Sequence, residues 1–540
     1  MKDHSSFLGP PLLEPLGKEA PLKSRKTPFK TVRLSLKDLV GREYIDAVCA
    51  ARAFLGGDEM QSLKTIVSEK VDFYPSDFYE RLRALLPQVG KKCCRGVKAS
   101  ARGATTTEFQ MHSNTANAPL SGLGFFRLGE DGRLFLTSKS EHYHVSLGHG
   151  FPGYRLVEIA RRLGIPNATH NNTRGHITRL LEEELVRAAA GIPRDDRSTL
   201  DRLLAAKSRT ALNRVLNLET GSLAAEAAIK LVLARFYQPQ TDSPAPKYRG
   251  RTPVLVVIGD DQGNLQANYH GTTITAQLMR GMWPGLIAGL EKQELLLERN
   301  VRPNSLEDLE SVFARYDEGK YKIAAFFHEL IMMNYGARRL TETYVKRLYA
   351  LCRAHDVPAV VDEIQTCVWS PELYLYREYK VHPDIVVVGK GFPGGEYAAS
   401  RILFNANLDT LPQFGALVTN GQEELASLVY LITLRWAEAN AEVTAAVGEY
   451  YEERLKCLAA RYPGIIALIE GKRHLAGVYF HDLAAGKRFA AYLNEAGLDI
   501  SVQTYKEGCP PSALTKLPLT AGYEVVDTVM ESMDQALKQV

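Results

Sequence analysis

Asp384-Ile385-Val386-Val387-Val388-Gly389-Lys390-Gly391 is an apolar run that ends in a lysine between two glycines. Upstream, Val357-Pro358-Ala359-Val360-Val361 is a second apolar run, and it ends in Asp362-Glu363-Ile364-Gln365-Thr366. Short continuous apolar runs of this kind predict strands that are buried on both faces, as in a parallel sheet. The two runs therefore predict a carboxylate and a lysine at the carboxyl ends of two buried strands.

A lysine and an aspartate in these places suit the chemistry of pyridoxal 5'-phosphate (PLP). A lysine amine forms a Schiff base with the aldehyde of this cofactor, and an aspartate keeps the pyridinium nitrogen protonated so that the ring can accept electrons. Each residue alone has a plainer explanation. Most lysines after strands are solvated, and an Asp-Glu pair after a strand is often a helix N-cap.

Outside these two segments, helices and short apolar strands alternate from about residue 155 onward. The predicted helices are 177–190, 223–237 and 341–355, and the predicted strands are 253–258, 323–327, 357–361, 384–388 and 400–404. This alternation predicts an α/β fold with a mostly parallel sheet. In such sheets ligands bind at the carboxyl ends of the strands, where Asp362 and Lys390 are expected.

Two further segments extend the predicted site. Thr220-Gly221-Ser222 precedes an alanine-rich helix, and the free N–H groups at a helix N-terminus bind anions such as phosphate. A simple N-cap explains the same residues. In Tyr269-His270-Gly271 the tyrosine ring can stack on a planar cofactor, although a core tyrosine is the plainer alternative. Glu329 adds a carboxylate at the end of a further predicted strand.

Taken together, these segments resemble the class III, PLP-dependent aminotransferases of fold type I. The resemblance covers about residues 145–540 and depends on the order and spacing of six segments, each of which is weak alone. They are Thr220-Gly221-Ser222 with the following Glu226-Ala227-Ala228, Tyr269-His270-Gly271, Glu329, Asp362-Glu363-Ile364-Gln365, Lys390-Gly391, and Thr419 to Ala426.

The resemblance implies a fold and a role for each residue. The fold would be α/β, with a large mostly parallel-sheet domain, a smaller α+β C-terminal domain and an extended N-terminal segment. Lys390 would bind PLP as a Schiff base and move a proton during catalysis, and Asp362 would pair with the pyridinium nitrogen. The other cofactor-binding residues would be Gly221 and Ser222 at the phosphate, Tyr269 and Ile364 on the two ring faces, Gln365 near the phenolic oxygen, Glu329 at its strand end, and Thr419 at the phosphate of a second subunit. The role of Thr419 implies a homodimer with shared active sites.

The C-terminal segment departs from the family's pattern. The family often has an arginine a few residues before Pro-Pro-Leu, where its guanidinium binds the substrate carboxylate. Leu514 stands at that position in this chain. Candidate substrate-binding residues in its place are Lys516, His170 and Arg174. For Arg174, a loop that caps the following helix is an equal alternative.

Three histidines, His142, His144 and His149, lie close together in the sequence. A metal site would need a carboxylate or cysteine at clear ligand spacing, which this stretch lacks. We therefore expect no metal here. Structural histidines are the favoured interpretation, and residues lining a substrate entrance are the alternative.

The composition is that of an ordinary soluble protein. The 540 residues are 45% hydrophobic and carry a net charge of +4, which gives no argument for a nucleic-acid partner. The seven cysteines are scattered, the N-terminus lacks a signal peptide, and no apolar run reaches transmembrane length. We expect a cytoplasmic protein with no membrane partner.

Three parts of the chain are expected. They are an N-terminal extension over 1–144, made of an irregular arm and a helical segment, a large PLP-binding domain over 145–410, and a small domain over 411–540. The role of about the first 120 residues stays open.

The favoured function is a PLP-dependent aminotransferase that moves an amino group from an amino donor to a keto or aldehyde acceptor. A second hypothesis is an aminomutase, epimerase or decarboxylase of the same fold, because fold does not fix chemistry. A third is a non-catalytic protein that uses the fold for binding. The sequence does not identify the donor or the acceptor.

Overall fold

The computed structural model describes residues 26–170, 172–503 and 509–540. Most of the predicted N-terminal arm, and Asn171 between the candidates His170 and Arg174, therefore lie outside the described residues. Among those described, no helix combines the length and the apolar character needed to cross a membrane.

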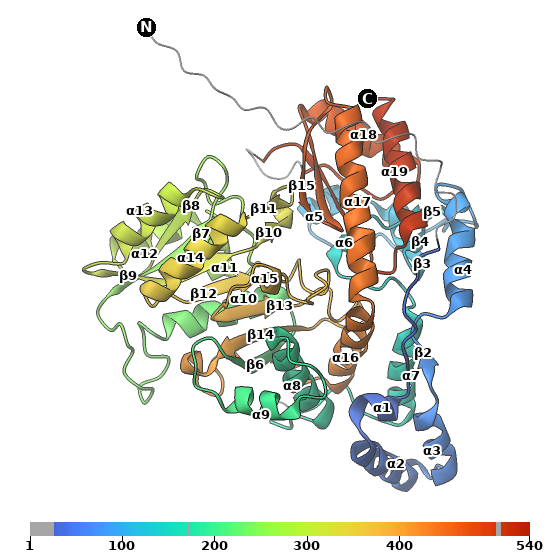
Figure 1. Cartoon of the computed structure of the whole chain (residues 1–540), viewed down its shortest axis with the longest axis horizontal. Coiled ribbons are helices and arrows are strands. Elements are labelled where there is room, and N and C mark those ends of the chain that lie inside the picture. The colour runs from blue at the N-terminus through green and yellow to red at the C-terminus, as the bar shows by residue number, and fades with distance from the viewer. Residues whose placement is uncertain (1–25, 171, 504–508) are drawn as a thin grey trace.

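The largest sheet has seven strands in the order β6-β14-β13-β12-β9-β7-β8 (Figure 1). They are β6 (Leu212–Leu218), β7 (Thr252–Ile258), β8 (Leu297–Val301), β9 (Tyr321–His328), β12 (Ala359–Asp362), β13 (Ile385–Val388) and β14 (Ser400–Asn405). Only β14 runs antiparallel to its neighbours, β13 and β6. The prediction of a mostly parallel sheet is confirmed.

Helices cover both faces of this sheet. On one face Leu255 and Val360 pack in the same core as α10 (Gly221–Leu233). On the other face Val254 and Val361 pack in the core that contains α14 (Glu342–Ala354). Adjacent residues of a strand point to opposite faces, so burial on both sides explains why the central strands are continuously apolar. Two further helices of this region are α8 (His176–Ala190) and α13 (Leu306–Tyr316).

The C-terminal part is a smaller α+β unit. Helices α16 (Glu424–Ala439) and α17 (Ala441–Arg461) form a column that runs from beside the large sheet into this unit (Figure 1). There, β15 (Ile466–Lys472), β16 (Leu475–Phe480) and β17 (Ser512–Lys516) form an antiparallel sheet in that order. Helices α18 (Leu483–Glu495) and α19 (Tyr523–Leu537) pack against each other, and α18 also contacts β16 and β17.

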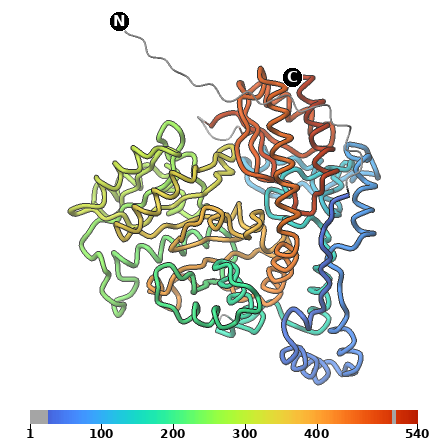
Figure 2. The backbone as a smooth tube through the Cα atoms, viewed as in Figure 1, coloured from blue at the N-terminus to red at the C-terminus, as the bar shows by residue number. Residues whose placement is uncertain are grey.

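Part of the N-terminal segment packs against this C-terminal unit. The segment begins with the predicted helical region, here α1 (Leu36–Val40), α2 (Arg42–Gly56), α3 (Met60–Ser68) and α4 (Ser76–Leu85). A small antiparallel sheet follows, formed by β3 (Pro119–Leu123), β4 (Phe126–Gly129) and β5 (Leu134–Leu136). Figure 2 shows the part with β3, β4 and β5, in cyan, beside the orange and red C-terminal helices.

Specific bonds join β4 and β5 to the chain after α18. The Leu136 N–H donates to the Gly497 carbonyl at 2.9 Å, and the Arg127 guanidinium lies 2.9 Å from the Asp499 carboxylate. The buried side chains of Phe126 and Leu136 belong to the same core as Leu498. The N-terminal strands are thus part of the C-terminal unit's packing.

Candidate active site

Asp362 and Lys390 lie at the carboxyl ends of neighbouring parallel strands. Asp362 is the last residue of β12 and is in register with Val387 of β13, and Lys390 follows β13 by two residues. Lys390 has a φ of 34°, a strained left-handed conformation for a non-glycine residue. Burial lowers the pKa of Lys390, and the nearby carboxylates of Glu329 and Asp362 oppose this shift.

The Asp362 carboxylate is held by two donors. Its Oδ1 accepts a hydrogen bond from the Ile364 N–H at 3.0 Å, and its Oδ2 lies 3.0 Å from His270 Nδ1. Only 4% of Asp362 and 1% of His270 is exposed. These two contacts fix the orientation of the Asp362 carboxylate at the end of β12. Sequence reasoning gave His270 no role, although it stands in the Tyr269-His270-Gly271 segment.

The residues before α10 form the predicted turn at a helix N-terminus. Thr220 caps the helix by accepting from the Leu223 N–H at 3.5 Å. A Cβ atom on Gly221 would stand 2.4 Å from Ile364 Cδ1, so glycine is needed for this close approach. The Ser222 Oγ accepts from the Thr272 N–H at 3.0 Å. The turn thus lies directly against the segment that follows Asp362.

The other predicted cofactor residues gather around the same strand ends. The Tyr269 N–H donates to Glu329 Oε1 at 3.3 Å, and the Arg280 guanidinium lies 4.4 Å from the centroid of the Tyr269 ring. Gln365 is buried, and its Oε1 has no hydrogen-bond partner in the described part of the chain. A buried polar atom without a partner is rare unless a ligand or water completes it.

These residues fit PLP. The helix N-terminus at Gly221 suits the phosphate, the Asp362 carboxylate suits the pyridinium nitrogen, and Lys390 is an amine whose pKa the carboxylates of Glu329 and Asp362 raise. The unmet hydrogen-bonding capacity of Gln365 suits a polar substituent on the ring.

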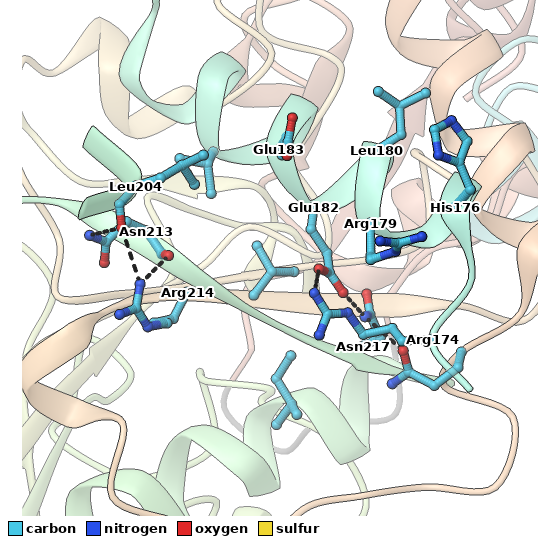
Figure 3. Close-up of a pocket in the computed structure, with 14 residues that line it drawn as sticks. Arg174, His176, Arg179, Leu180, Glu182, Glu183, Leu204, Asn213, Arg214 and Asn217 are labelled. Carbon is cyan, nitrogen blue, oxygen red and sulfur yellow. Dashed lines mark hydrogen bonds and ion pairs between the residues drawn. The ribbon is translucent and has the colours of Figure 1, made fainter. Parts of the chain in front are cut away.

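Thr419 and Arg174 lie elsewhere. Thr419 is exposed, in the chain before α16. Arg174 pairs with Glu182 at 2.8 Å, and Asn217 donates to the same carboxylate at 2.7 Å. Figure 3 shows both side chains pointing at Glu182, in a cavity of about 590 Å³ between α8 and β6 whose lining includes none of the predicted cofactor residues.

The other two candidate substrate residues are also already engaged. His170 Nδ1 accepts from the Asn172 N–H at 3.2 Å. Lys516 is fully buried, and its Nζ donates to the carbonyl of Gln365 and, at 3.3 Å, to that of Tyr143. Its amine therefore binds the protein's own backbone rather than facing solvent.

A left-handed turn that includes His142 lies next to Lys390. Ser140, Glu141, His142 and Tyr143 have φ values of 46°, 47°, 59° and 77°, and a left-handed residue costs about 1–2 kcal/mol unless it is glycine. Bonds to β17 hold the turn, because the Ser140 Oγ donates to the Lys516 carbonyl at 2.5 Å and the Lys516 N–H donates to the Ser138 carbonyl at 2.8 Å.

The histidines of this turn line a second cavity of about 490 Å³. Burial and then the charge of Lys390 lower the pKa of His142 to about 4, and the same two causes lower the pKa of His144. His149 Nε2 lies 3.0 Å from Glu141 Oε1. In the described ranges no cluster of three side chains suited to a metal ion is found. The cavity is lined by Pro119, Lys139, Glu141, His142, His144, Val145, His149, Gly394, Gly395, Glu396 and Asp499.

Comparison with known proteins places the chain in a family. The model of the class III aminotransferases matches residues 175–537. The chain is 26% identical to ornithine aminotransferase from Saccharomyces cerevisiae over 368 residues, which are 64% of this chain and 76% of the relative. It is 23% identical to acetylornithine aminotransferase from Aquifex aeolicus over 353 residues, 64% of this chain and 81% of the relative.

Solved structures share the fold. Ornithine aminotransferase from Toxoplasma gondii superposes with a TM-score of 0.61 at 20% identity, over 81% of this chain and 96% of that one. An amine transaminase from an uncultivated Pseudomonas species gives a TM-score of 0.63 at 19% identity, over 83% and 100% of the two chains. Because the family model matches well over half of its residues, the chain belongs to the class III aminotransferases, PLP-dependent enzymes of fold type I.

Proposed function

We propose that Lys390 is the residue that binds PLP covalently and that the enzyme uses it to transfer an amino group from an amino-acid or amine donor to a keto or aldehyde acceptor. The observation that supports this most is the placement of Asp362 and Lys390 at the ends of adjacent parallel strands. Bound PLP supplies an aldehyde that condenses with amines and a ring that accepts electrons.

The surrounding residues would orient the cofactor. Asp362, oriented by His270, would pair with the protonated ring nitrogen. The α10 N-terminus with Gly221 and Ser222 would bind the phosphate. The remaining contacts would be Tyr269 and Ile364 on the ring faces, and Gln365 and Glu329 at its polar edge.

The donor is proposed to be an amino acid or a related amine. Relatives of the chain are ornithine and acetylornithine aminotransferases, which makes ornithine and N-acetylornithine the first donors to test. The apolar Leu514, 4% exposed on β17, supports a way of binding the substrate carboxylate that does not use a guanidinium at that position.

Visible absorption tests this proposal. Wild-type protein with PLP should show a yellow band that Lys390→Ala lacks, and a productive donor should bleach it with release of a keto product. A band that no donor bleaches would favour an aminomutase, epimerase or decarboxylase. No band after addition of PLP would refute the catalytic assignment of Lys390.

We further propose a homodimer in which Thr419 reaches the phosphate bound by its partner. The exposure of Thr419 and its position before α16 support a role outside its own subunit. Lys390→Ala and Thr419→Glu, which brings a carboxylate toward the phosphate, should each be inactive. Mixed dimers of the two should regain activity, because one of their two sites is then intact. If Thr419 acts within its own subunit, no site is restored and the mixture stays inactive.

We also propose a division of the chain into domains. The large PLP-binding domain would span 145–410, the small domain 411–540, and the N-terminal extension 1–144, of which β4 and β5 contact the chain after α18. All seven cysteines are free in the structure, which supports a reducing, cytoplasmic location. Limited proteolysis tests the boundaries, since cleavage should concentrate at exposed connections.

A further inference from the structure

Arg280 carries a guanidinium that has no ionic partner among the described residues. Its Nε is buried and lacks a hydrogen-bond partner in the described part of the chain, and no carboxylate there lies within ion-pair distance of the side chain. The guanidinium instead lies over the Tyr269 ring, 4.4 Å from its centroid. A guanidinium is always charged, and a half-buried charge without an opposite charge is costly. The position of Arg280 therefore requires an explanation.

The backbone around Arg280 holds it in this place. The short helix α11 (Ile274–Leu278) separates Tyr269 from Arg280 in the sequence. Asn268, which is 2% exposed, donates from its side chain to the Met279 carbonyl at 2.7 Å. The residue before Tyr269 is thus tied to the residue before Arg280. The contact between guanidinium and ring is fixed by this bond as well as by the attraction between a cation and an aromatic face.

Tyr269 connects this cation to the proposed reaction centre. The Tyr269 N–H donates to Glu329 Oε1 at 3.3 Å. Burial lowers the pKa of Lys390, and the charge of Glu329 opposes this shift, so Glu329 lies close to the Lys390 amine. Arg280 therefore borders the group of residues proposed to hold the cofactor.

The other positions considered for binding a substrate carboxylate do not offer a free cation. Leu514 is apolar and buried, at 4% exposure. Arg174 already pairs with Glu182 at 2.8 Å, and Lys516 is fully buried against backbone carbonyls. Arg280 differs from these residues because it combines a permanent charge with the absence of a carboxylate partner in the described ranges.

We propose that Arg280 binds the carboxylate of the substrate and makes the enzyme prefer amino acids to simple amines. This inference rests on the proposed function. A guanidinium offers two parallel N–H donors, which match the two oxygens of a carboxylate. These donors lie in the plane of the group, so a guanidinium placed over a ring keeps them for a further partner. The phosphate of the cofactor is the other anion that a guanidinium would bind, and the measurements below distinguish the two.

Protection from phenylglyoxal, which modifies accessible arginines, tests the proposal without turnover. The rate of modification of Arg280 is read by peptide mass spectrometry in the cofactor-free full chain, in the PLP-loaded chain, and in the loaded chain with pentanoate. Pentanamide, which has a similar shape and no charge, is the control ligand. Arg315, which lies over the Tyr316 ring on α13 at 5.2 Å, is the internal reference.

Pentanoate should slow the modification of Arg280 severalfold in the loaded chain, and pentanamide should not. The rate at Arg315 should stay unchanged. If PLP alone protects Arg280 and pentanoate adds nothing, the guanidinium binds the phosphate and the proposal is wrong. Absence of protection by either compound would overturn it as well. The yellow band of bound PLP is read in the same samples, so a failure of the proposed function is seen separately.

Substitution separates a carboxylate site from a purely structural contact with Tyr269. Arg280→Met should raise the half-saturating concentration of ornithine in single-turnover reactions by about 10- to 150-fold, which corresponds to one charged hydrogen bond. The maximal rate, and the reaction with 1,4-diaminobutane, which is ornithine without its carboxylate, should stay within about threefold of wild type. Arg280→Lys, which keeps the charge and loses the paired donors, should lie between the two. Arg315→Met, which removes a similar contact with a tyrosine ring, should match wild type.

Equal losses with both donors in a folded Arg280→Met protein would show that Arg280 only supports Tyr269, and the proposal would be wrong. If Arg280→Met does not fold, the protection of wild-type Arg280 by pentanoate still decides. If wild type reacts with neither donor, the choice of donor fails, and the same protection measurement still decides on Arg280.

Discussion

Replacing Asp362 by asparagine should slow the reaction with an amino donor by two to four orders of magnitude. Asp362 is 4% exposed and receives hydrogen bonds from the Ile364 N–H and His270, so its charge acts in a region poor in water. At an effective dielectric constant of about 20, two unit charges at hydrogen-bond distance, about 3 Å, attract each other by about 5 kcal/mol. That energy sets an upper limit of about four orders of magnitude on the rate. Asparagine keeps a neutral hydrogen bond, so part of the effect is retained.

The assay is a single-turnover reaction in which stopped-flow absorbance follows the bound cofactor after mixing with donor. The matched control is Asp384→Asn. Asp384 is also an aspartate, is 5% exposed, and adjoins the same two strands at their opposite end, where the Arg209 Nε donates to it at 2.6 Å. The Asp384→Asn variant should have a lower free energy of unfolding than wild type. Its single-turnover rate should stay within about threefold of wild type, since no charge near the candidate active site changes.

Two outcomes would refute this reasoning. A rate for Asp362→Asn within tenfold of wild type, with cofactor bound, would show that its charge is not needed. An equal loss of rate in both variants would show that the effect comes from a disturbed sheet rather than from the charge at the end of β12.

Two further predictions concern stability. His474 is buried, and burial followed by the charge of Arg473 lowers its pKa to about 3. The unfolded chain binds a proton at this histidine near pH 6.5, so the free energy of unfolding should fall by up to about 1.4 kcal/mol for each pH unit below 6.5. His474→Gln should therefore flatten the fall of the urea-unfolding midpoint between pH 7 and 5, and an identical slope in both proteins would contradict the assignment. Gly391→Ala would place a Cβ 2.4 Å from Trp369 Cζ3, and this change should lower the thermal unfolding midpoint by several degrees. In the control Gly285→Ala, in α12 (Pro284–Lys292), the new Cβ meets no atom within 4 Å, so the midpoint should not fall. Equal midpoints for the two glycine variants would show that the Trp369 contact is unimportant.

The central strands of the large sheet could be predicted because burial on both faces leaves an unbroken apolar run. The two edge strands could not. β6 carries Asn213, Arg214 and Asn217, and β8 carries Arg299 and Asn300. An edge strand has only one neighbour in the sheet, so polar residues are tolerated there and break the pattern that marks a buried strand.

In the candidate site, the positions of residues that directly follow a predicted strand could be predicted from the sequence. Asp362 and Lys390 are examples, since neighbouring parallel strands bring their ends together. The burial of Lys516 could not be predicted, because a lysine two residues after Leu514 gives no sign that backbone carbonyls and an indole will surround it. The left-handed turn was hidden for a related reason. Ser140 to Tyr143 contains no glycine, so the usual signal for positive φ is absent.

The bond between Lys516 and the Tyr143 carbonyl also has a consequence for biosynthesis. The two residues are 373 positions apart, so at about 5–20 residues per second the ribosome needs about 20 to 75 seconds to make the second after the first. During that interval the turn at 140–143 has no β17 to hold it, and β5 has no Gly497 carbonyl to pair with. Until then the apolar side chains of the nascent N-terminal strands stay exposed to solvent, and we expect chaperones to protect them from aggregation. A ribosome that stalls before residue 516 would release a chain that contains every strand of the large sheet but lacks the β17 contact of the turn at 140–143.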